Sequence, residues 1–493
     1  MGVMPSMRAL GLRSVIVAGL ASGLFAAPAL ARGVPDGFAD LAEKLLPAVV
    51  NVSTTHVEEG GDQTDLGFPP GSPFDEFFKQ YFDRQRGNGE HRKHKVRSLG
   101  SGFVIDPKGF IVTNNHVIDE ATEIVVSFHD GREMPATLVG RDAKTDVALL
   151  KVESKDDLPA VPFGDSDKTR VGDWVLAIGN PFGLGGTVTA GIVSARGRDI
   201  NAGPYDDFIQ TDASINRGNS GGPMFNMDGK VIGVNSMIFS PSGGSVGIGF
   251  AIPAKTVQMV VDNLKAYGKV RRGWLGVTIQ HVTEDIAESL GLKHPMGALV
   301  QGVQPGSPAA KAGIEEGDLI VSFDGKTVEE MRRLPRIVAE TEIGKSVTVE
   351  IIRNGKTITR SVKVGEMKDE TVAKGKGKNR PGPDHDMTGG RTIKSLGLTV
   401  SPISQALREK YDLADDQKGV VVTAVDSEGP AAEKGIQPGV VIEAVTQKAV
   451  STPEEVREGV RAAVKAGRQS VLLQVRLGDR KRFLAIKIGG EKD

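Results

Sequence analysis

The chain of 493 residues contains no cysteine, few aromatic residues (5%) and almost no net charge (-1). Without cysteine, neither disulfide bonds nor thiol chemistry can contribute to its stability or its activity. Its 61 basic and 62 acidic residues are balanced, so it lacks the positive charge typical of nucleic-acid-binding proteins, and no nucleic-acid partner is expected. At this length one hydrophobic core is insufficient, and the chain should divide into several domains.

Glycine and proline, by contrast, are abundant, at 63 and 26 residues. This composition favours many short strands joined by tight turns over long helices. We therefore expect a mainly β fold.

A long apolar run stands out at the N-terminus, where VIVAGLASGLFAA spans Val15–Ala27. Arg8 and Arg13 precede it, and Ala29-Leu30-Ala31 supplies the small residues that a signal peptidase recognises. The alternative is a short membrane anchor, but the run is shorter than the roughly 20 residues that span a bilayer. We predict a cleaved signal peptide at residues 1–31 and no transmembrane segment in the remaining chain.

Behind the signal, composition divides the chain into four parts. A Gly-rich region of short Val/Ile strands is followed by two similar segments, which are separated by a stretch of charged residues, glycine and proline that cannot bury a core. The repeat is visible in Pro308–Ile314 and Pro430–Ile436, and each copy ends in two strands with a hairpin turn at Asn354-Gly355 or Gly478-Asp479. The predicted parts are a first domain at 37–266, a repeat module at 271–364, a flexible linker at 365–390 and a second module at 391–489.

A reactive serine is indicated by the hexapeptide GNSGGP at residues 218–223, in which Ser220 lies among residues with little side-chain bulk. A nucleophilic serine needs an accessible hydroxyl and neighbouring N–H groups that point at the developing oxyanion. Glycine permits the backbone angles and the close approach that this requires. The same hexapeptide could also be an ordinary hairpin loop, so this motif alone leaves both interpretations open.

A histidine and an aspartate accompany this serine. His116 follows the strand-like run Phe110–Thr113, and Asp146 precedes the apolar run Val147–Val152. The order His, Asp, Ser, with each residue at a strand edge, matches the trypsin-type arrangement. There His116 would take the serine proton, Asp146 would hold the histidine tautomer, and the N–H groups of Gly218 and Ser220 would form the oxyanion hole.

Other chemistries fit less well. An α/β-hydrolase elbow needs a helix after the serine and then Asp and His downstream, whereas a hairpin-like segment follows Pro223. His91 and His94 lack an acid cluster or cysteine that would complete a metal site. The GKT and GKS tripeptides at 325–327 and 344–346 lack the leading glycine of a phosphate-binding loop. We therefore expect no metal, no ATP and no other cofactor.

Four motifs in the same order resemble the HtrA/Deg serine proteases, and the similarity covers nearly the whole mature chain. They are TNNHV at 113–117, TDVALLKV at 145–152, GNPFGLGGTVTAGIVSARGR at 179–198 and TDASINRGNSGGPMFNMDGKVIGVN at 211–235. The resemblance implies a trypsin/chymotrypsin-like double β-barrel followed by two PDZ domains. It further implies an ATP-independent periplasmic endopeptidase that degrades misfolded or unfolded exported proteins and forms homo-oligomers built from trimers. A chaperone or scaffold in which binding dominates over cleavage is the alternative.

The specificity pocket can be partly inferred. Trypsin-like enzymes that cut after Lys or Arg carry an acid six residues before the nucleophile, where this chain has Ser214. The segment Asn235–Phe239, including Met237, would supply an apolar and fairly bulky pocket wall. Cleavage after small or medium aliphatic residues such as Val or Ala is expected, and the family resemblance implies the same.

The two modules contain a loop that resembles the carboxylate-binding loop of PDZ domains. It is Trp274-Leu275-Gly276-Val277 in the first copy and Ser395-Leu396-Gly397-Leu398 in the second. Its N–H groups would capture a peptide C-terminus while the peptide adds as a strand to the sheet edge; the simpler alternative is a strand entering a β domain. In the second copy Val440 replaces the acid found at Asp318, so that module could serve assembly more than capture.

The segment at 66–82 concentrates six aromatic residues beside several Pro and Gly. A solvated loop does not normally expose so many aromatic side chains. We expect it to contact another subunit, with a flap packed on its own domain as the alternative.

Overall fold

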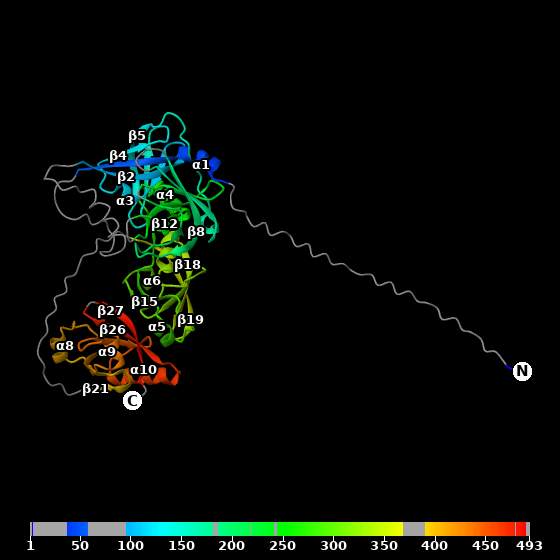
Figure 1. Cartoon of the computed structure of the whole chain (residues 1–493). Coiled ribbons are helices and arrows are strands. Elements are labelled where there is room, and N and C mark those ends of the chain that lie inside the picture. The colour runs from blue at the N-terminus through cyan, green and yellow to red at the C-terminus, as the bar shows by residue number, and fades with distance from the viewer. Residues whose placement is uncertain are drawn as a thin grey trace.

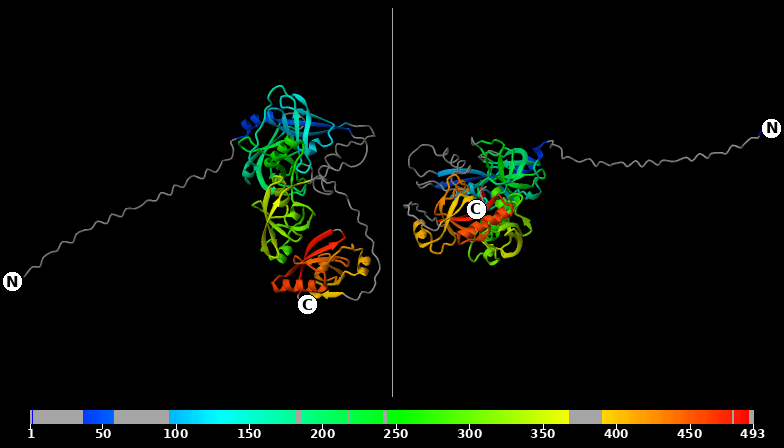
Figure 2. Two further views of the ribbon diagram at one scale, coloured as in Figure 1. Left: turned by 180° about the vertical axis from the view of Figure 1, so that it is seen from behind. Right: turned by 90° about the horizontal axis from the view of Figure 1, so that it is seen from below.

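The structure, a computed structural model, describes residue 2 and residues 37–57, 95–180, 186–216, 218–240, 244–367, 390–478 and 480–489. Almost all of the predicted signal peptide, the aromatic segment at 66–82, the histidine pair at 91 and 94 and most of the predicted linker lie outside these residues. Figure 1 shows three bodies in succession, a two-barrel domain and then the two repeat modules, and the left view of Figure 2 shows the same order from behind.

The first barrel closes through six antiparallel strands in the order β1-β2-β3-β6-β5-β4. Its strands are β1 (Val49–Val57), β2 (Lys95–Asp106), β3 (Phe110–Thr113), β4 (Glu123–Ser127), β5 (Glu133–Asp142) and β6 (Val147–Val152). β6 is apolar at almost every position because both of its faces are buried: Leu150 points into this barrel, while Leu149 belongs to a second cluster shared with the next barrel. The short helix α3 (Asn115–Ile118) follows β3.

The second barrel has the order β10-β11-β12-β9-β8-β7. Its strands are β7 (Trp174–Gly179), β8 (Thr187–Arg198), β9 (Phe208–Thr211), β10 (Pro223–Phe225), β11 (Val231–Ile238) and β12 (Gly249–Pro253). All eight residues of β11 are buried. The shared cluster joins Phe103 and Leu149 of the first barrel to Leu176, Phe225 and Val234 of the second, so the two barrels have one continuous core between them.

Helices pack on the outside of the barrels. α4 (Ala254–Tyr267) buries Val257, Val260, Val261 and Leu264, a spacing that places all four on one helix face. It ends at Gly268, whose φ of 69° is left-handed and whose N–H closes the helix on the Leu264 carbonyl. Other helical elements among the described residues of this region are α1 (Ala39–Leu45), the 3-10 turn η1 (Leu46–Ala48) and the 3-10 turn η2 (Ser166–Lys168).

The first module is a sheet in the order β14-β15-β16-β18-β19, with β17 paired to β16. Its strands are β13 (Gly273–Trp274), β14 (Val277–Gln280), β15 (Ala298–Val303), β16 (Leu319–Phe323), β17 (Lys326–Thr327), β18 (Ser346–Arg353), β19 (Lys356–Lys363) and β20 (Gly365–Glu366), and its helices are α5 (Glu284–Leu290), α6 (Pro308–Lys311) and α7 (Arg333–Glu340). Asn354 and Gly355 have φ of 52° and 72° and connect β18 to β19, as the predicted hairpin requires. β20 pairs with β13, so strand pairing continues two residues past the predicted end of the module at 364.

The second module repeats this topology in the order β22-β23-β24-β26-β27, with β25 paired to β24, and adds β21 beside β22. Its strands are β21 (Arg391–Ile393), β22 (Leu398–Pro402), β23 (Val420–Val425), β24 (Val441–Val445), β25 (Lys448–Ala449), β26 (Ser470–Leu477) and β27 (Arg480–Lys487), and its helical elements are η4 (Lys394–Leu396), α8 (Gln405–Tyr411), α9 (Pro430–Glu433) and α10 (Pro453–Lys465). The duplication read from the sequence is therefore also a duplication of topology.

Buried contacts join the three bodies. Arg272, at the start of the first module, donates to Asp142 at the end of β5, and both side chains are at least nine-tenths buried. The two modules share an apolar cluster in which Leu290 and Leu299 of the first meet Leu472 and Phe483 of the second. The bodies are consequently packed against one another, with buried charge at the first junction and apolar surface at the second.

Candidate active site

Asp146 lies in the turn between β5 and β6, with a left-handed φ of 57° and 7% of its surface exposed. One carboxylate oxygen, Oδ1, accepts the main-chain N–H of His116 at 3.0 Å. The other, Oδ2, accepts from His116 Nδ1 at 2.8 Å and from the Ser236 hydroxyl at 2.9 Å. Three donors thus fix the position of the buried carboxylate.

His116 lies in α3, directly after β3, and the adjacent backbone ties it to the same turn. The Asn114 side chain donates to the Asp146 carbonyl at 2.7 Å, and the Asn115 N–H donates to that carbonyl at 3.2 Å. When Nδ1–H donates a hydrogen bond to Asp146, the neutral ring carries its lone pair on Nε2. That nitrogen can act as a general base towards a serine hydroxyl.

The backbone of Ser220 is held between the two barrels. Its carbonyl accepts the N–H of Ser101 in β2 at 2.8 Å, and the N–H of Gly221 donates to the Asn235 carbonyl in β11 at 2.8 Å. Gly221 has a φ of 85°, and a Cβ there would lie 2.2 Å from the Ser101 carbonyl oxygen. A Cβ on Gly222 would lie 2.3 Å from the Ile178 carbonyl oxygen. Glycine is therefore required at both positions by the close approach of neighbouring backbone.

The two N–H groups of the predicted oxyanion hole lie in this same turn. Gly218 has a φ of 96°, and its carbonyl accepts from the Ser101 hydroxyl, which itself accepts the Asn180 N–H at 2.8 Å. No residue within the described parts of the chain accepts a hydrogen bond from the N–H of Gly218 or Ser220. Two donors that lack internal acceptors suit the stabilisation of a substrate oxyanion.

The predicted pocket residues fall into two groups. Ser214 is exposed, and its carbonyl accepts from the Thr189 hydroxyl at 2.9 Å. Asn235 is fully buried; its N–H donates to the Gly222 carbonyl at 2.9 Å and its side chain donates to the Pro223 carbonyl at 3.2 Å. Met237 is 2% exposed and packs in the core between the barrels. The Asn235 side chain therefore supports the Ser220 turn from behind, while Ser214 lies at the surface.

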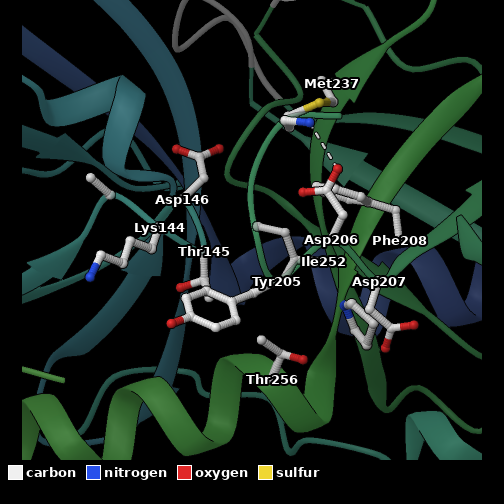
Figure 3. Close-up of a pocket in the computed structure, with 13 residues that line it drawn as sticks. Lys144, Thr145, Asp146, Tyr205, Asp206, Asp207, Phe208, Met237, Ile252 and Thr256 are labelled. Carbon is white, nitrogen blue, oxygen red and sulfur yellow. Dashed lines mark hydrogen bonds between the residues drawn. The ribbon is translucent and has the colours of Figure 1, made fainter. Parts of the chain in front are cut away.

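Asp146 also lines a cavity, which Figure 3 shows. Lys144, Thr145 and Asp146 form one wall, and Tyr205 and Asp206 approach from the segment between β8 and β9. Burial raises the pKa of Asp206 to about 6, although its carboxylate accepts the N–H groups of Ala202 at 2.8 Å and Ile200 at 3.1 Å. Burial likewise raises the pKa of Tyr205.

Sequence reasoning missed several residues that support this site. Ser236 contacts Asp146 across 90 positions, and Arg272 contacts Asp142 across 130. Asp142 also accepts a hydrogen bond from the hydroxyl of Thr145, the residue directly before Asp146. Since Arg272 also lies 4.8 Å from the centre of the Tyr205 ring, it joins both walls of the cavity to the first module.

The predicted carboxylate-binding loop of the first module connects β13 to β14. Leu275 is 4% exposed, whereas Trp274 and Val277 are half-buried. Gly276 has a φ of 80°, and a Cβ there would lie 2.3 Å from the Ser307 Cβ. The loop thus needs glycine, and within the described residues β15 is the only strand that pairs with β14. Within the described part of the chain, the opposite edge of β14 thus carries no paired strand.

Comparison with known families agrees with this geometry. The family described as "Trypsin-like peptidase domain" matches residues 100–234, and the family described as "PDZ domain" matches residues 273–364. A double barrel with a His–Asp pair beside a glycine-framed serine, followed by such a domain, defines a trypsin-like serine peptidase with a PDZ module.

Similar proteins narrow the family. A "periplasmic serine endoprotease DegP-like" of Brucella suis biovar 1 (strain 1330) is 46% identical over 477 residues, which covers 92% of this chain and 90% of the relative. One of the same name from Rhizobium meliloti (strain 1021) is 42% identical over 479 residues, covering 93% of each chain. The solved structure "HtrA-type protease AlgW with decapeptide" is 40% identical, covers 68% of this chain and all of its own, and superposes with a TM-score of 0.55.

The chain belongs to the HtrA family of DegP-like serine endoproteases, and it is a serine endopeptidase. The mainly β double-barrel fold and the PDZ module expected from the sequence are confirmed. The alternative in which binding dominates over cleavage is not favoured, because the relatives are named as endoproteases. Among the described residues, no helix combines the length and the apolar character needed to cross a membrane.

Proposed function

We propose that this chain cuts unfolded or misfolded exported proteins in the periplasm, without ATP, using Ser220 as nucleophile and His116 as general base. The observation that carries this proposal is the pair of contacts from both Asp146 oxygens to His116. They orient the imidazole and select its Nδ1–H tautomer, which is the state a general base requires. The relatives named as periplasmic endoproteases support the compartment.

In the proposed reaction the Ser220 oxygen attacks the scissile carbonyl while its proton passes to His116 Nε2. The carbonyl π bond becomes an oxyanion, which the N–H groups of Gly218 and Ser220 stabilise. The imidazolium then protonates the leaving amine as the C–N bond breaks, and Asp146 stabilises its positive charge meanwhile. Water, deprotonated by the same histidine, releases the acyl group and restores the serine.

Substrate choice follows from the uncharged residue at position 214. Ser214 offers no charge to a basic side chain, so Lys and Arg have no partner there. We therefore propose cleavage after Val, Ala and similar aliphatic residues. The Asn235 side chain, being buried, would act on cleavage through the Ser220 turn, and the backbone of β11 would lie beside the substrate.

The first module, in this proposal, binds the C-terminal ends of polypeptides at Trp274–Val277. Support comes from the glycine loop, the free edge of β14 and the match to PDZ domains. Substrate proteins thus become tethered near the cleavage site. Assembly of the chain into trimers belongs to the same proposal, and size-exclusion chromatography with light scattering tests it.

The direct test compares the mature chain with Ser220→Ala on reduced casein. We expect the wild type to release fragments whose new C-termini are mainly Val or Ala, identified by mass spectrometry. The variant should lose at least about 10³-fold in rate, as other serine peptidases do without the nucleophile. Equal rates would contradict the catalytic assignment, and cleavage after Lys or Arg would contradict the pocket assignment alone.

A further inference from the structure

The two repeat modules differ at one sheet edge. In the first module β14 is the edge strand next to the glycine loop. In the second, the corresponding strand β22 pairs with β23 on one side and with β21 on the other. The β21–β22 pairing is antiparallel, with Arg391 opposite Val400, Thr392 opposite Thr399 and Ile393 opposite Leu398.

The loops before β14 and β22 correspond in position, although the first follows strand β13 and the second includes the 3-10 turn η4. Gly276 and Gly397 both have left-handed φ, 80° and 67°. Trp274 is paired with Gly365 at the end of the first module, and the Ser395 carbonyl accepts the Gly489 N–H at 2.7 Å at the end of the second. The edge of β22 covered by β21 is therefore the counterpart of the edge where a PDZ domain takes a peptide.

The direction of β21 also matches that of a bound chain end. A peptide that adds antiparallel to β22 has its C-terminus beside the glycine loop, and β21 likewise ends beside that loop at Ile393. The next carbonyl, of Lys394, accepts the Gly397 N–H at 3.0 Å. In the first module no acceptor for the Gly276 N–H occurs among the described residues. The Gly397 N–H is thus already used by the closing bond of the 3-10 turn η4 and is not left for a peptide carboxylate.

The side chains of β21 are also held in the second module, by contacts with α10. Ile393 is fully buried and belongs to one cluster with Val456 and Val460 of α10. At the other end of β21, Arg391 pairs with Glu454, also in α10. In Figure 1, β21 lies beside α10 at the end of the second module.

The apolar residues of β14 and β22 differ accordingly in exposure. Leu398 and Val400 of β22 are 1% and 0% exposed. The corresponding residues of β14, Val277 and Ile279, are only half-buried. Among the described residues, the apolar edge of the first module is thus partly exposed and that of the second is covered, as expected for an open groove and an occupied one.

We propose that Arg391–Ile393 is a built-in ligand that fills the peptide groove of the second module, so that only the first module binds chain ends. This inference rests on the proposed peptide binding of the first module. Because the ligand is part of the same chain, a free peptide competes with an effective concentration on the order of millimolar. If the segment Arg391–Ile393 has a dissociation constant of about 10 μM for the open groove, a free peptide would therefore bind that groove about 100-fold more weakly.

Peptide titration on the whole chain tests the inference. The background is Ser220→Ala, which prevents cleavage, and the probe is a fluorescein-labelled heptapeptide ending in three valines with a free carboxylate. Its C-terminally amidated twin is the control for carboxylate recognition. We expect one site per chain by calorimetry, and none after Ile279→Arg, which places a charge in the groove of the first module. Two sites, or one surviving Ile279→Arg, would overturn the inference.

Opening the second groove provides the converse experiment. Adding Arg391→Ala and Ile393→Gly to the Ile279→Arg chain should restore one site for the free-carboxylate peptide and none for the amide. If the opened chain retains its circular dichroism spectrum but binds nothing, the segment is not a ligand. Failure of the first module alone would look different: the chain with intact Ile279 would bind no peptide, while the opened variant would still gain a site.

A disulfide lock gives an answer even if the opened variant does not fold. The hydroxyls of Thr392 and Thr399 are 3.0 Å apart on the exposed face, and the chain has no cysteine of its own. Thr392→Cys with Thr399→Cys should form a disulfide under mild oxidation, and peptide stoichiometry should be one in both redox states. Failure to form the disulfide would contradict the pairing. Two sites in the reduced form and one in the oxidised form would show that the segment does not hold the groove closed.

Discussion

Replacing Asp146 by asparagine tests how the carboxylate acts on His116. Three hydrogen-bond donors converge on the carboxylate: the His116 main-chain N–H, its Nδ1–H and the Ser236 hydroxyl. Asparagine has one acceptor and one donating amino group, so it cannot serve both His116 donors. The main-chain N–H cannot change its role. If it keeps the amide oxygen, the amino group faces Nδ1, and the ring proton must move to Nε2.

A histidine protonated at Nε2 cannot accept the serine proton, so Asp146→Asn should reduce kcat by about 10⁴-fold. Rotating the asparagine side-chain amide would restore the tautomer. It would, however, place the amino group opposite the His116 main-chain N–H, and two donors facing each other in a buried site cost about 1–3 kcal/mol. The assay is hydrolysis of a peptide p-nitroanilide with valine before the scissile bond, with kcat and KM measured separately.

The matched control for this substitution is Ser236→Ala. It removes one of the three donors to Asp146 and leaves the tautomer intact, so a loss of about 1 kcal/mol, or about fivefold in kcat, is expected. The reasoning fails if Asp146→Asn retains activity within tenfold of wild type while its circular dichroism spectrum is unchanged. It also fails if Ser236→Ala is the more damaging change.

Three further predictions concern the surroundings of the triad. Gly221→Ala should destabilise the chain by at least about 2 kcal/mol and abolish casein cleavage, because φ of 85° is unfavourable for alanine and its Cβ would lie 2.2 Å from the Ser101 carbonyl oxygen; normal thermal stability would contradict this. Arg272→Met leaves Asp142 buried and unpaired, so a loss of about 3–5 kcal/mol in urea unfolding is expected, which adding Asp142→Asn should partly reverse. Asp206 has a pKa raised to about 6, so the folded state holds a proton that the unfolded state releases between about pH 4 and pH 6. Stability should fall over that window as pH rises, by about 1–2 kcal/mol after allowance for partial solvent screening. Asp206→Asn should remove that part of the pH dependence, and an unchanged profile would refute the assignment.

Much of the two-barrel domain could be predicted because its signals are local. The apolar runs at Phe110–Thr113 and Val147–Val152 became β3 and β6, and His116 and Asp146 lie directly beyond their ends, as expected. The hairpin at Asn354-Gly355 was likewise encoded in two adjacent residues that tolerate positive φ.

Other features could not be predicted, because they depend on contacts between residues distant in the chain. Ser236 was part of the predicted pocket wall, and nothing in its neighbours indicates that it donates to Asp146. The buried pair of Arg272 and Asp142 joins two domains, and no sequence period reports such a contact. Asn235 illustrates a further difficulty: its position in the chain was compatible with a pocket wall, but only the packing of β11 shows that its side chain points towards Pro223.

The two modules have similar sequences but differ in whether another strand covers the sheet edge beside the glycine loop. The WLGV and SLGL loops share a glycine with left-handed φ, and both were candidates for peptide capture. The residues before them differ: Arg271 and Arg272 contact Glu366 and Asp142, whereas Arg391–Ile393 turns back along its own sheet. Whether an edge strand is covered depends on the tertiary contacts that these preceding residues make, which local propensity does not determine.

The most direct measurement of the central claim is covalent labelling of Ser220 with a fluorophosphonate. The reagent phosphonylates a serine activated by a general base and loses fluoride, so the modified peptide can be located by mass spectrometry. We predict a single adduct at Ser220 and no labelling of Ser220→Ala. Labelling should be at least 10³-fold slower in His116→Ala. An adduct on a different serine, or labelling at Ser220 that does not depend on His116, would contradict the account.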